Sequence, residues 1–187
     1  LEVLRQARTG ELAFDGARIS GHARLQTPVD VPLLVSALRP TAYRLAGELA
    51  DGAIAWVTPP AFLRDVAGPA LRDSAAAHGR PQPRLVGHAF ALVTSDPAEA
   101  TAAGTQRLAN YTRLPFYQAM FADAGHPDAT DGRVPDALAD GLLQVGAEAH
   151  VADGLRRFAD AGCDEVIVSL LPGSNDDIGR TLALLGG

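Results

Sequence analysis

Short apolar runs alternate with helix-length segments along most of the chain, and this alternation restricts the fold more than any other feature. The runs are apolar on both faces, which is typical of buried parallel strands. Parallel strands need long crossover connections, and the segments between the runs are long enough to form helices. Strands are expected at residues 33–37, 53–57, 85–93 and 165–170.

The segments between these runs have the signals of helices and of one hairpin. Residues 41–50 place apolar side chains at the i, i+3, i+4 and i+7 positions of one helical face. Asp15-Gly16 stands between two short apolar runs, which predicts an irregular hairpin at residues 11–25. The other expected helices are residues 1–8, 62–78, 96–111, 114–124, 135–143, 147–161 and 176–185.

This order of elements predicts an α/β fold with a parallel sheet covered by helices. The 187 residues fit one domain or part of a larger one. We expect one partial domain, with a helix and hairpin at residues 1–30 and strand–helix units at residues 31–187. The first residues already read as helix without an N-cap signal, so we expect the chain to be the C-terminal part of a longer protein.

Charge and composition exclude several classes of function. The net charge is −6, and no basic run interleaved with aromatic residues suggests nucleic acid as a partner. No apolar run is long enough to predict a membrane span. The single cysteine, Cys163, excludes an internal disulfide, and we expect a reducing, cytoplasmic location. The five histidines have no metal-ligand spacing, so no metal site is expected.

The point where the strand at 33–37 leads into a helix is the first candidate site. Ligands of parallel α/β folds bind at this end of the strands. A helix start favours an anion, and an arginine there can bind a phosphate through two hydrogen bonds. A plain turn with a solvated arginine explains the same sequence, so both interpretations stay open. The residues concerned are Ser36, Ala37, Leu38, Arg39 and Pro40.

Trp56 and Thr58 follow the next strand at the same end. A tryptophan in this position can stack on a flat ring of a ligand, or it can cap the core. His88 lies within the third strand, where a buried imidazole with satisfied hydrogen bonds is a simpler interpretation than an acid or base. No catalytic residue is identified from the sequence.

An aromatic-rich segment forms the last candidate. Tyr111, Phe116 and Tyr117 lie in two consecutive predicted helices. They can form the wall of a substrate pocket, or they can be helix-to-helix packing, which is the common role of aromatic stripes.

Four segments resemble the luciferase-like family of flavin- or deazaflavin-dependent oxidoreductases, in particular the branch that uses coenzyme F420. The most specific is PLLVSALRPTAYRLAGELADGAIAWVT at residues 32–58. It is similar to a signature of Ala-x-(Gly or Arg)-Pro, a helix, Ala-Gly-Glu-x-Ala-Asp-Gly and a strand. The weaker segments are ELAFDGARISGHARL, LVTSDPAEATAAG and GAEAHVADGLRRFADAGCDEVIVSLLP.

This resemblance implies the C-terminal half, strands five to eight, of a TIM-type (β/α)8 barrel with a helical insertion. It implies hydride transfer between coenzyme F420 and a small organic substrate, with an FMN-dependent monooxygenase as the alternative. The cofactor would lie near residues 36–40, Trp56 and Thr58, and a homodimer is possible. An alternative of another class is a non-catalytic α/β fragment that associates through its exposed sheet edge.

Overall fold

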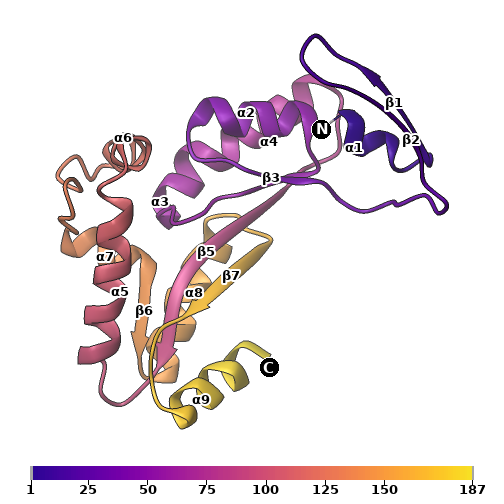
Figure 1. The fold of residues 1–187 in the computed structure, drawn as a ribbon. Helices are drawn as coiled ribbons and strands as arrows, with labels where there is room; N and C mark the ends of the chain where they lie inside the picture. Colours follow the sequence, from indigo (N-terminus) through magenta and orange to yellow (C-terminus); the bar gives the residue numbers. More distant parts are fainter. Residues whose placement is uncertain (1, 187) are drawn as a thin grey trace.

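The computed structural model describes residues 2–186, which form one parallel sheet, the helices packed on it and a separate hairpin (Figure 1). Within these residues the sheet has five strands, all in parallel pairs. The strands are β3 (Leu34–Ser36), β4 (Gly52–Ile54), β5 (Arg84–Val93), β6 (Leu143–Gly146) and β7 (Glu165–Leu170).

The helices and the hairpin agree with the expected segments to within a few residues. The hairpin pairs β1 (Glu11–Asp15) with β2 (Ser20–Arg24) in antiparallel register. The expected helix at 62–78 is one continuous stretch that includes a π-helical turn, η1 (Leu63–Ala67). The other helices are α1 (Glu2–Gln6), α2 (Pro40–Leu49), α3 (Pro60–Phe62), α4 (Gly68–Ala77), α5 (Ala98–Tyr111), α6 (Pro115–Asp123), α7 (Asp136–Leu142), α8 (Glu148–Asp160) and α9 (Asn175–Gly186).

The strand β6 corrects the expectation of four strands. The sequence predicted a connection between two helices here, but residues 143–146 pair with residues 90–93 of β5. The segment has only four residues and includes Gln144, so it lacks the apolar run that marks the other strands. Gln144 is nevertheless fully buried.

The four expected strands pair in chain order, β3 with β4, β4 with β5 and β5 with β7, as neighbouring strands of a barrel do, and β6 is an additional strand. Val86 of β5 pairs with both β4 and β7, and Phe90 pairs with both β6 and β7. Each residue has only two neighbours in a sheet, so β4 and β6 share one edge of β5 and β7 takes the other. The parallel sheet is as expected, and its four expected strands follow one another in chain order, with β6 added at the edge of β5 that β4 also uses.

The segment at residues 32–58, which carries the family resemblance, contains two glycines where the structure leaves no room for a side chain. Gly47 lies where α2 meets α4, and a Cβ there would collide with the carbonyl oxygen of Leu71. Gly52 lies on β4 against the backbone of Arg84, the first residue of β5. The two glycines therefore let the helix pair and the strand pair approach closely.

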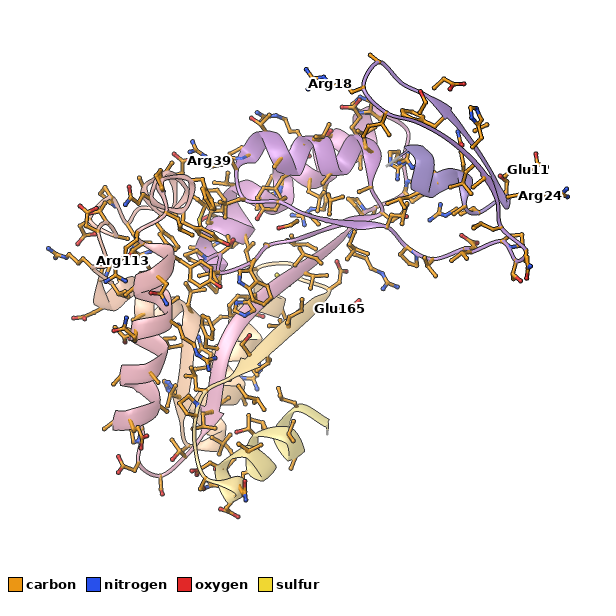
Figure 2. All side chains as sticks on the ribbon, viewed as in Figure 1. Glu11, Arg18, Arg24, Arg39, Arg113 and Glu165 are labelled. Atoms are coloured by element: carbon orange, nitrogen blue, oxygen red, sulfur yellow. The ribbon has the colours of Figure 1, made fainter. Side chains whose placement is uncertain are left out.

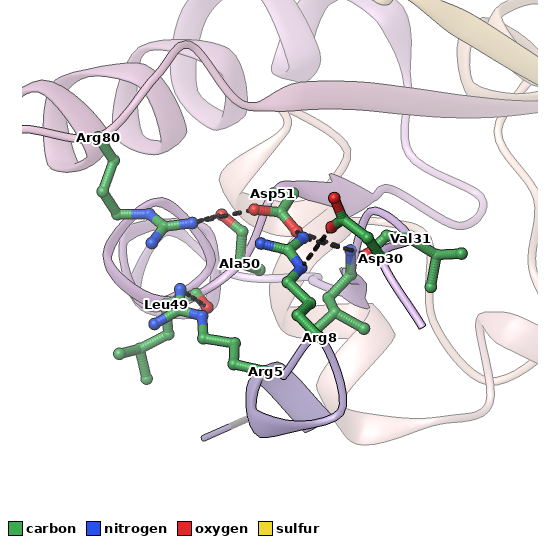
Figure 3. Close-up of polar contacts among 9 residues, drawn as sticks. Arg5, Arg8, Asp30, Val31, Leu49, Ala50, Asp51 and Arg80 are labelled. Atoms are coloured by element: carbon green, nitrogen blue, oxygen red, sulfur yellow. Dashed lines mark hydrogen bonds and ion pairs between the residues drawn. The ribbon is translucent and has the colours of Figure 1, made fainter. Parts of the chain in front are cut away.

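Asp51, between these glycines, joins the N-terminal segment to the sheet (Figure 3). Its carboxylate accepts hydrogen bonds from the Leu33 N–H at 2.8 Å, from Arg8 Nη2 at 2.7 Å and from Arg80 Nη2 at 3.2 Å. Burial alone would raise the pKa of Asp51, but the Leu33 N–H and the two arginines together lower it below its usual range. Arg5 adds a hydrogen bond to the carbonyl oxygen of Leu49.

The hairpin beyond this junction projects away from the sheet (Figure 1). All residues of β2 are exposed. Figure 2 shows Glu11, Arg18 and Arg24 extending from the hairpin rather than toward the sheet. The contacts of Asp51 are therefore an important part of what holds residues 2–30 to the rest of the chain.

Candidate functional site

The ends of β3 and β4 lie side by side, as their positions in a parallel sheet require. Ala37, which follows β3, donates its N–H to the carbonyl oxygen of Ile54 at 3.0 Å. Ser36 and Arg39 are exposed, Leu38 and Pro40 are half-buried and Ala37 is buried. Pro40 is the first residue of α2, as the sequence predicted.

Arg39 has a partner that the sequence did not indicate. Its Nη2 atom lies 2.9 Å from Oδ2 of Asp123, the last residue of α6, and both side chains are partly exposed. Figure 2 shows the Arg39 side chain on the side of the molecule where α6 lies. The pair connects the predicted phosphate-binding turn with the aromatic helix.

Trp56 and His88 form the centre of a cluster on the sheet. Their rings are stacked with centroids 3.7 Å apart and an angle of 27° between the planes. The indole Nε1–H of Trp56 donates a hydrogen bond to the Tyr111 hydroxyl at 2.9 Å. The ring of Tyr117 meets that of Tyr111 edge-on at 4.9 Å. These four residues, together with Ser169, which is hydrogen-bonded to His88, are called the His88 cluster below.

His88 is fully buried, yet only one of its ring nitrogens has a partner. Nε2 is hydrogen-bonded to Ser169 Oγ of β7 at 2.9 Å, and Nδ1 has no partner in the described chain. Burial lowers the pKa of His88 to about 4, so the imidazole is neutral at pH 7. The expected buried imidazole is confirmed, but its hydrogen bonds are not all satisfied. An unpaired buried nitrogen is costly, and such an atom is a candidate for ligand binding.

The backbone beside Trp56 is strained. Val57 has a φ of 51°, a left-handed conformation that is rare for a β-branched residue. Such strain costs about 1–3 kcal/mol and is found mainly at functional sites. Thr58, which follows, is fully buried and donates its hydroxyl to the Trp56 carbonyl oxygen at 3.3 Å. Thr58 therefore fixes the turn and does not present its hydroxyl to solvent.

The aromatic residues of α5 and α6 divide into two groups. Tyr111 and Tyr117 join the His88 cluster, and burial together with the nearby Tyr111 raises the pKa of Tyr117 to about 12. Phe116 is 55% exposed, and its ring centroid lies 5.2 Å from that of Tyr117. The structure thus brings Trp56, Tyr111 and Tyr117 together and leaves Phe116 at the rim.

Sequence reasoning missed the two polar residues of this cluster. His88 was interpreted as structural, and Ser169 was not considered, because its β7 strand is far away in the chain. The pairing of residues 86–91 with residues 165–170 brings the two side chains together. The only sequence signal was an imidazole in an otherwise apolar strand.

Neither a metal site nor a membrane-spanning helix is found in the described residues. Residues 2–186 contain no group of three histidine, cysteine or carboxylate side chains that could hold a metal ion. None of the helices in this range is long and apolar enough to cross a membrane.

Known structures with the same fold include two enzymes that their descriptions call F420-dependent. An F420-dependent tetrahydromethanopterin reductase from Methanopyrus kandleri is 19% identical, with a TM-score of 0.74 over 99% of this chain and 59% of its own. An F420-dependent secondary alcohol dehydrogenase, in complex with an F420–acetone adduct, is 17% identical, with a TM-score of 0.69 over 89% of this chain and 52% of its own.

A flavin enzyme has the same fold. The oxygenating constituent of 3,6-diketocamphane monooxygenase from Pseudomonas putida, in complex with FMN, is 12% identical, with a TM-score of 0.65 over 97% of this chain and 58% of its own. The chain therefore spans between half and three-fifths of the length of these three proteins. No curated protein sequence matches it significantly. The family model described as luciferase-like monooxygenase matches residues 1–165, so the chain belongs to this family.

Proposed function

We propose that the chain is the C-terminal part of a coenzyme F420-dependent oxidoreductase that transfers hydride between the deazaflavin and a small organic substrate. In the longer protein it would supply the last strands of a TIM-type barrel. The observation that carries the proposal is the His88 cluster, where a buried imidazole keeps one free nitrogen beside a stacked tryptophan. The likeness to the F420-dependent reductase, over 99% of the chain, supports this choice of cofactor.

The turn after β3 fits the phosphate-bearing end of such a cofactor. Pro40 has no N–H, and the N–H groups of Ala42 and Tyr43 already donate to the Arg39 carbonyl oxygen. The first turn of α2 therefore offers few free donors, and an anion would depend mainly on the Arg39 guanidinium. Arg39 would exchange Asp123 for a phosphate, because both ion-pair partners are at the surface.

The His88 cluster fits the ring of the cofactor and the substrate. His88 covers one face of Trp56, and a ligand would use the other face and the Tyr111 hydroxyl. When bound, the deazaflavin supplies the hydride-transfer chemistry, and the protein supplies position and exclusion of water. If the Ser169 hydroxyl donates to Nε2, neutral His88 would carry its proton on Nδ1 and would donate it to a carbonyl or alcohol oxygen without adding charge.

The second candidate is an FMN-dependent monooxygenase, which is favoured by the FMN complex among the similar structures. The test is an assay of the full-length protein with each cofactor and a panel of small alcohols and ketones. The leading proposal predicts substrate-dependent change in the visible absorbance of the deazaflavin under anaerobic conditions. Turnover only with reduced FMN and oxygen would favour the second candidate, and no turnover with either cofactor would contradict both.

A further inference from the structure

One cavity in the described residues lies away from the His88 cluster. It has a volume of about 440 Å³, and its walls come from the start of α3, the loop after α6, the helix α7 and the end of α8. On β5, Gly87 faces α8, because a Cβ there would collide with Phe158. Neighbouring strand residues point to opposite faces, so His88 lies on the other side of the sheet.

Arg157 is an exposed residue of α8 that two hydrogen bonds hold in the wall of this cavity. Its Nη2 donates to the Asp140 carbonyl oxygen at 2.9 Å and to Gln144 Oε1 at 2.8 Å. Gln144 is fully buried, and its own amide donates to the Gly141 carbonyl oxygen at 3.3 Å. Gly154 leaves the space for Gln144, because any side chain at that position would collide with it. Both hydrogen bonds use Nη2, which leaves Nη1 and Nε of the guanidinium for a ligand.

The other groups of the cavity define what it can bind. Arg64 is engaged with Asp65 through two hydrogen bonds of 2.7 and 2.8 Å, so this pair adds little net charge. Asp160 is the one carboxylate in the wall. Burial lowers the pKa of His126, against the opposing effect of Asp128, so the ring is a neutral hydrogen-bonding group at pH 7.

Proline and alanine side chains form the rest of the wall, with Pro59, Pro60 and Ala137 among them. The volume falls in the range of small-molecule sites. One free guanidinium edge opposite apolar side chains matches a single carboxylate on a small apolar body. A polyphosphate would need more positive charge than the cavity has.

We propose that this cavity is a second binding site, which takes a small organic monocarboxylate through Arg157 and His126. The site is separate from the proposed cofactor site and does not depend on the proposed function. The guanidinium would bind the carboxylate through two hydrogen bonds, and the proline and alanine wall would cover the apolar body.

The experiment titrates the protein with benzoate, and with neutral benzamide as the matched ligand, while following the imidazole resonances of His126 by NMR. We expect saturable shifts with benzoate and much weaker binding of benzamide. Arg157→Gln should weaken benzoate binding about tenfold or more, since it removes a charge-assisted contact. Arg156→Gln is the matched control, because this neighbour is exposed and pairs with Asp153.

A second variant tests the same site independently, in case Arg157→Gln does not fold. Ala137→Trp fills the cavity from an exposed position of α7 without removing any polar group. It should also abolish benzoate binding, with an unfolding temperature close to that of the unchanged protein. The proposal is wrong if no saturable shift occurs up to about 10 mM benzoate. It is equally wrong if Ala137→Trp leaves binding intact, or if benzamide binds as well as benzoate.

Discussion

His88 is the residue whose properties most affect the candidate site. The sequence placed it correctly in a buried strand. It could not indicate that Ser169 would bind Nε2 or that Nδ1 would stay free, because the partner comes from a strand about 80 residues later. The contact of Arg39 could not be predicted from the sequence either, for the same reason. Its position at the helix start was predictable, but its pairing with Asp123 depends on how α6 packs.

Protonation of His88 should destabilise the fold. The pKa of His88 is about 4 in the folded chain against an ordinary value of 6.5, so the unfolded chain binds more protons between these values. The contribution of His88 to stability is therefore complete above about pH 6.5 and is lost as the pH falls toward 4. One pKa unit corresponds to about 1.4 kcal/mol, so the loss can reach about 3 kcal/mol.

Denaturant unfolding at a series of pH values measures this loss. His88→Gln should flatten the pH dependence between 6.5 and 4, whereas His78→Gln, at an exposed position, should not. If the His88→Gln profile runs parallel to that of the unchanged protein, the buried imidazole does not titrate as described.

Arg39 and Asp123 should differ in their effect on cofactor binding. Arg39→Ala removes a charge-assisted contact with phosphate and should raise the dissociation constant of coenzyme F420 roughly 10- to 150-fold. Asp123→Ala instead frees the guanidinium and should leave binding unchanged or tighter. Both changes should alter the unfolding free energy by less than about 1 kcal/mol, because the pair is exposed. An Arg39→Ala constant within about twofold of the original would mean that Arg39 does not bind the phosphate.

The elements were predictable where the sequence pattern is long and regular, and not where it is short. The ten-residue strand β5, the six-residue β7 and the helix α2 lie where their apolar patterns indicated. The strand β6 has four residues and a buried glutamine, so its backbone pairing with β5 overrides a weak local pattern. The π-helical turn η1 had no sequence signal at all.

Asp51→Asn should loosen the N-terminal elements from the sheet. The substitution removes the charge that Arg8 and Arg80 share and weakens the bond from the Leu33 N–H. The expected loss of unfolding free energy is about 1–3 kcal/mol, with faster hydrogen exchange in residues 2–30. Asp30→Asn, which affects only a strongly exposed partner of Arg8, should have almost no effect. Equal exchange rates in the two variants would contradict the role given to Asp51.

Gly47→Ala should destabilise the contact between α2 and α4. The added methyl group meets the backbone of α4 at Leu71, which cannot move without shifting the helix. Overpacking of this kind costs about 1–3 kcal/mol. Gly179→Ala in α9 is the matched control, since nothing lies within 4 Å of its Cβ position and alanine favours a helix. Thermal unfolding of both variants checks this, and a stable Gly47→Ala protein would show that the helices can separate freely.

At the scale of the whole molecule, the parallel sheet and its helical cover were predictable from the sequence pattern, and the order of the four expected strands from the family resemblance, but the added strand β6 was not. Apolar runs show that a strand is buried and do not show which strand lies beside it. The family resemblance implied the pairing of β7 with β5, because they are successive expected strands, whereas the pairing of β6 with β5 has no counterpart in the sequence pattern. The pairing of β7 with β5 brings Ser169 to His88, but the register that places these two side chains together is seen only in the three-dimensional structure.

Calorimetric titration of the full-length protein with coenzyme F420 tests the central claim, that the His88 cluster is part of the cofactor and substrate site. The account predicts saturable binding, weakened about tenfold by His88→Gln, which removes the imidazole nitrogen, and also weakened by Trp56→Ala. His78→Gln should bind as the unchanged protein does. Absence of F420 binding, or equal affinity in all four proteins with the fold intact, would contradict the claim.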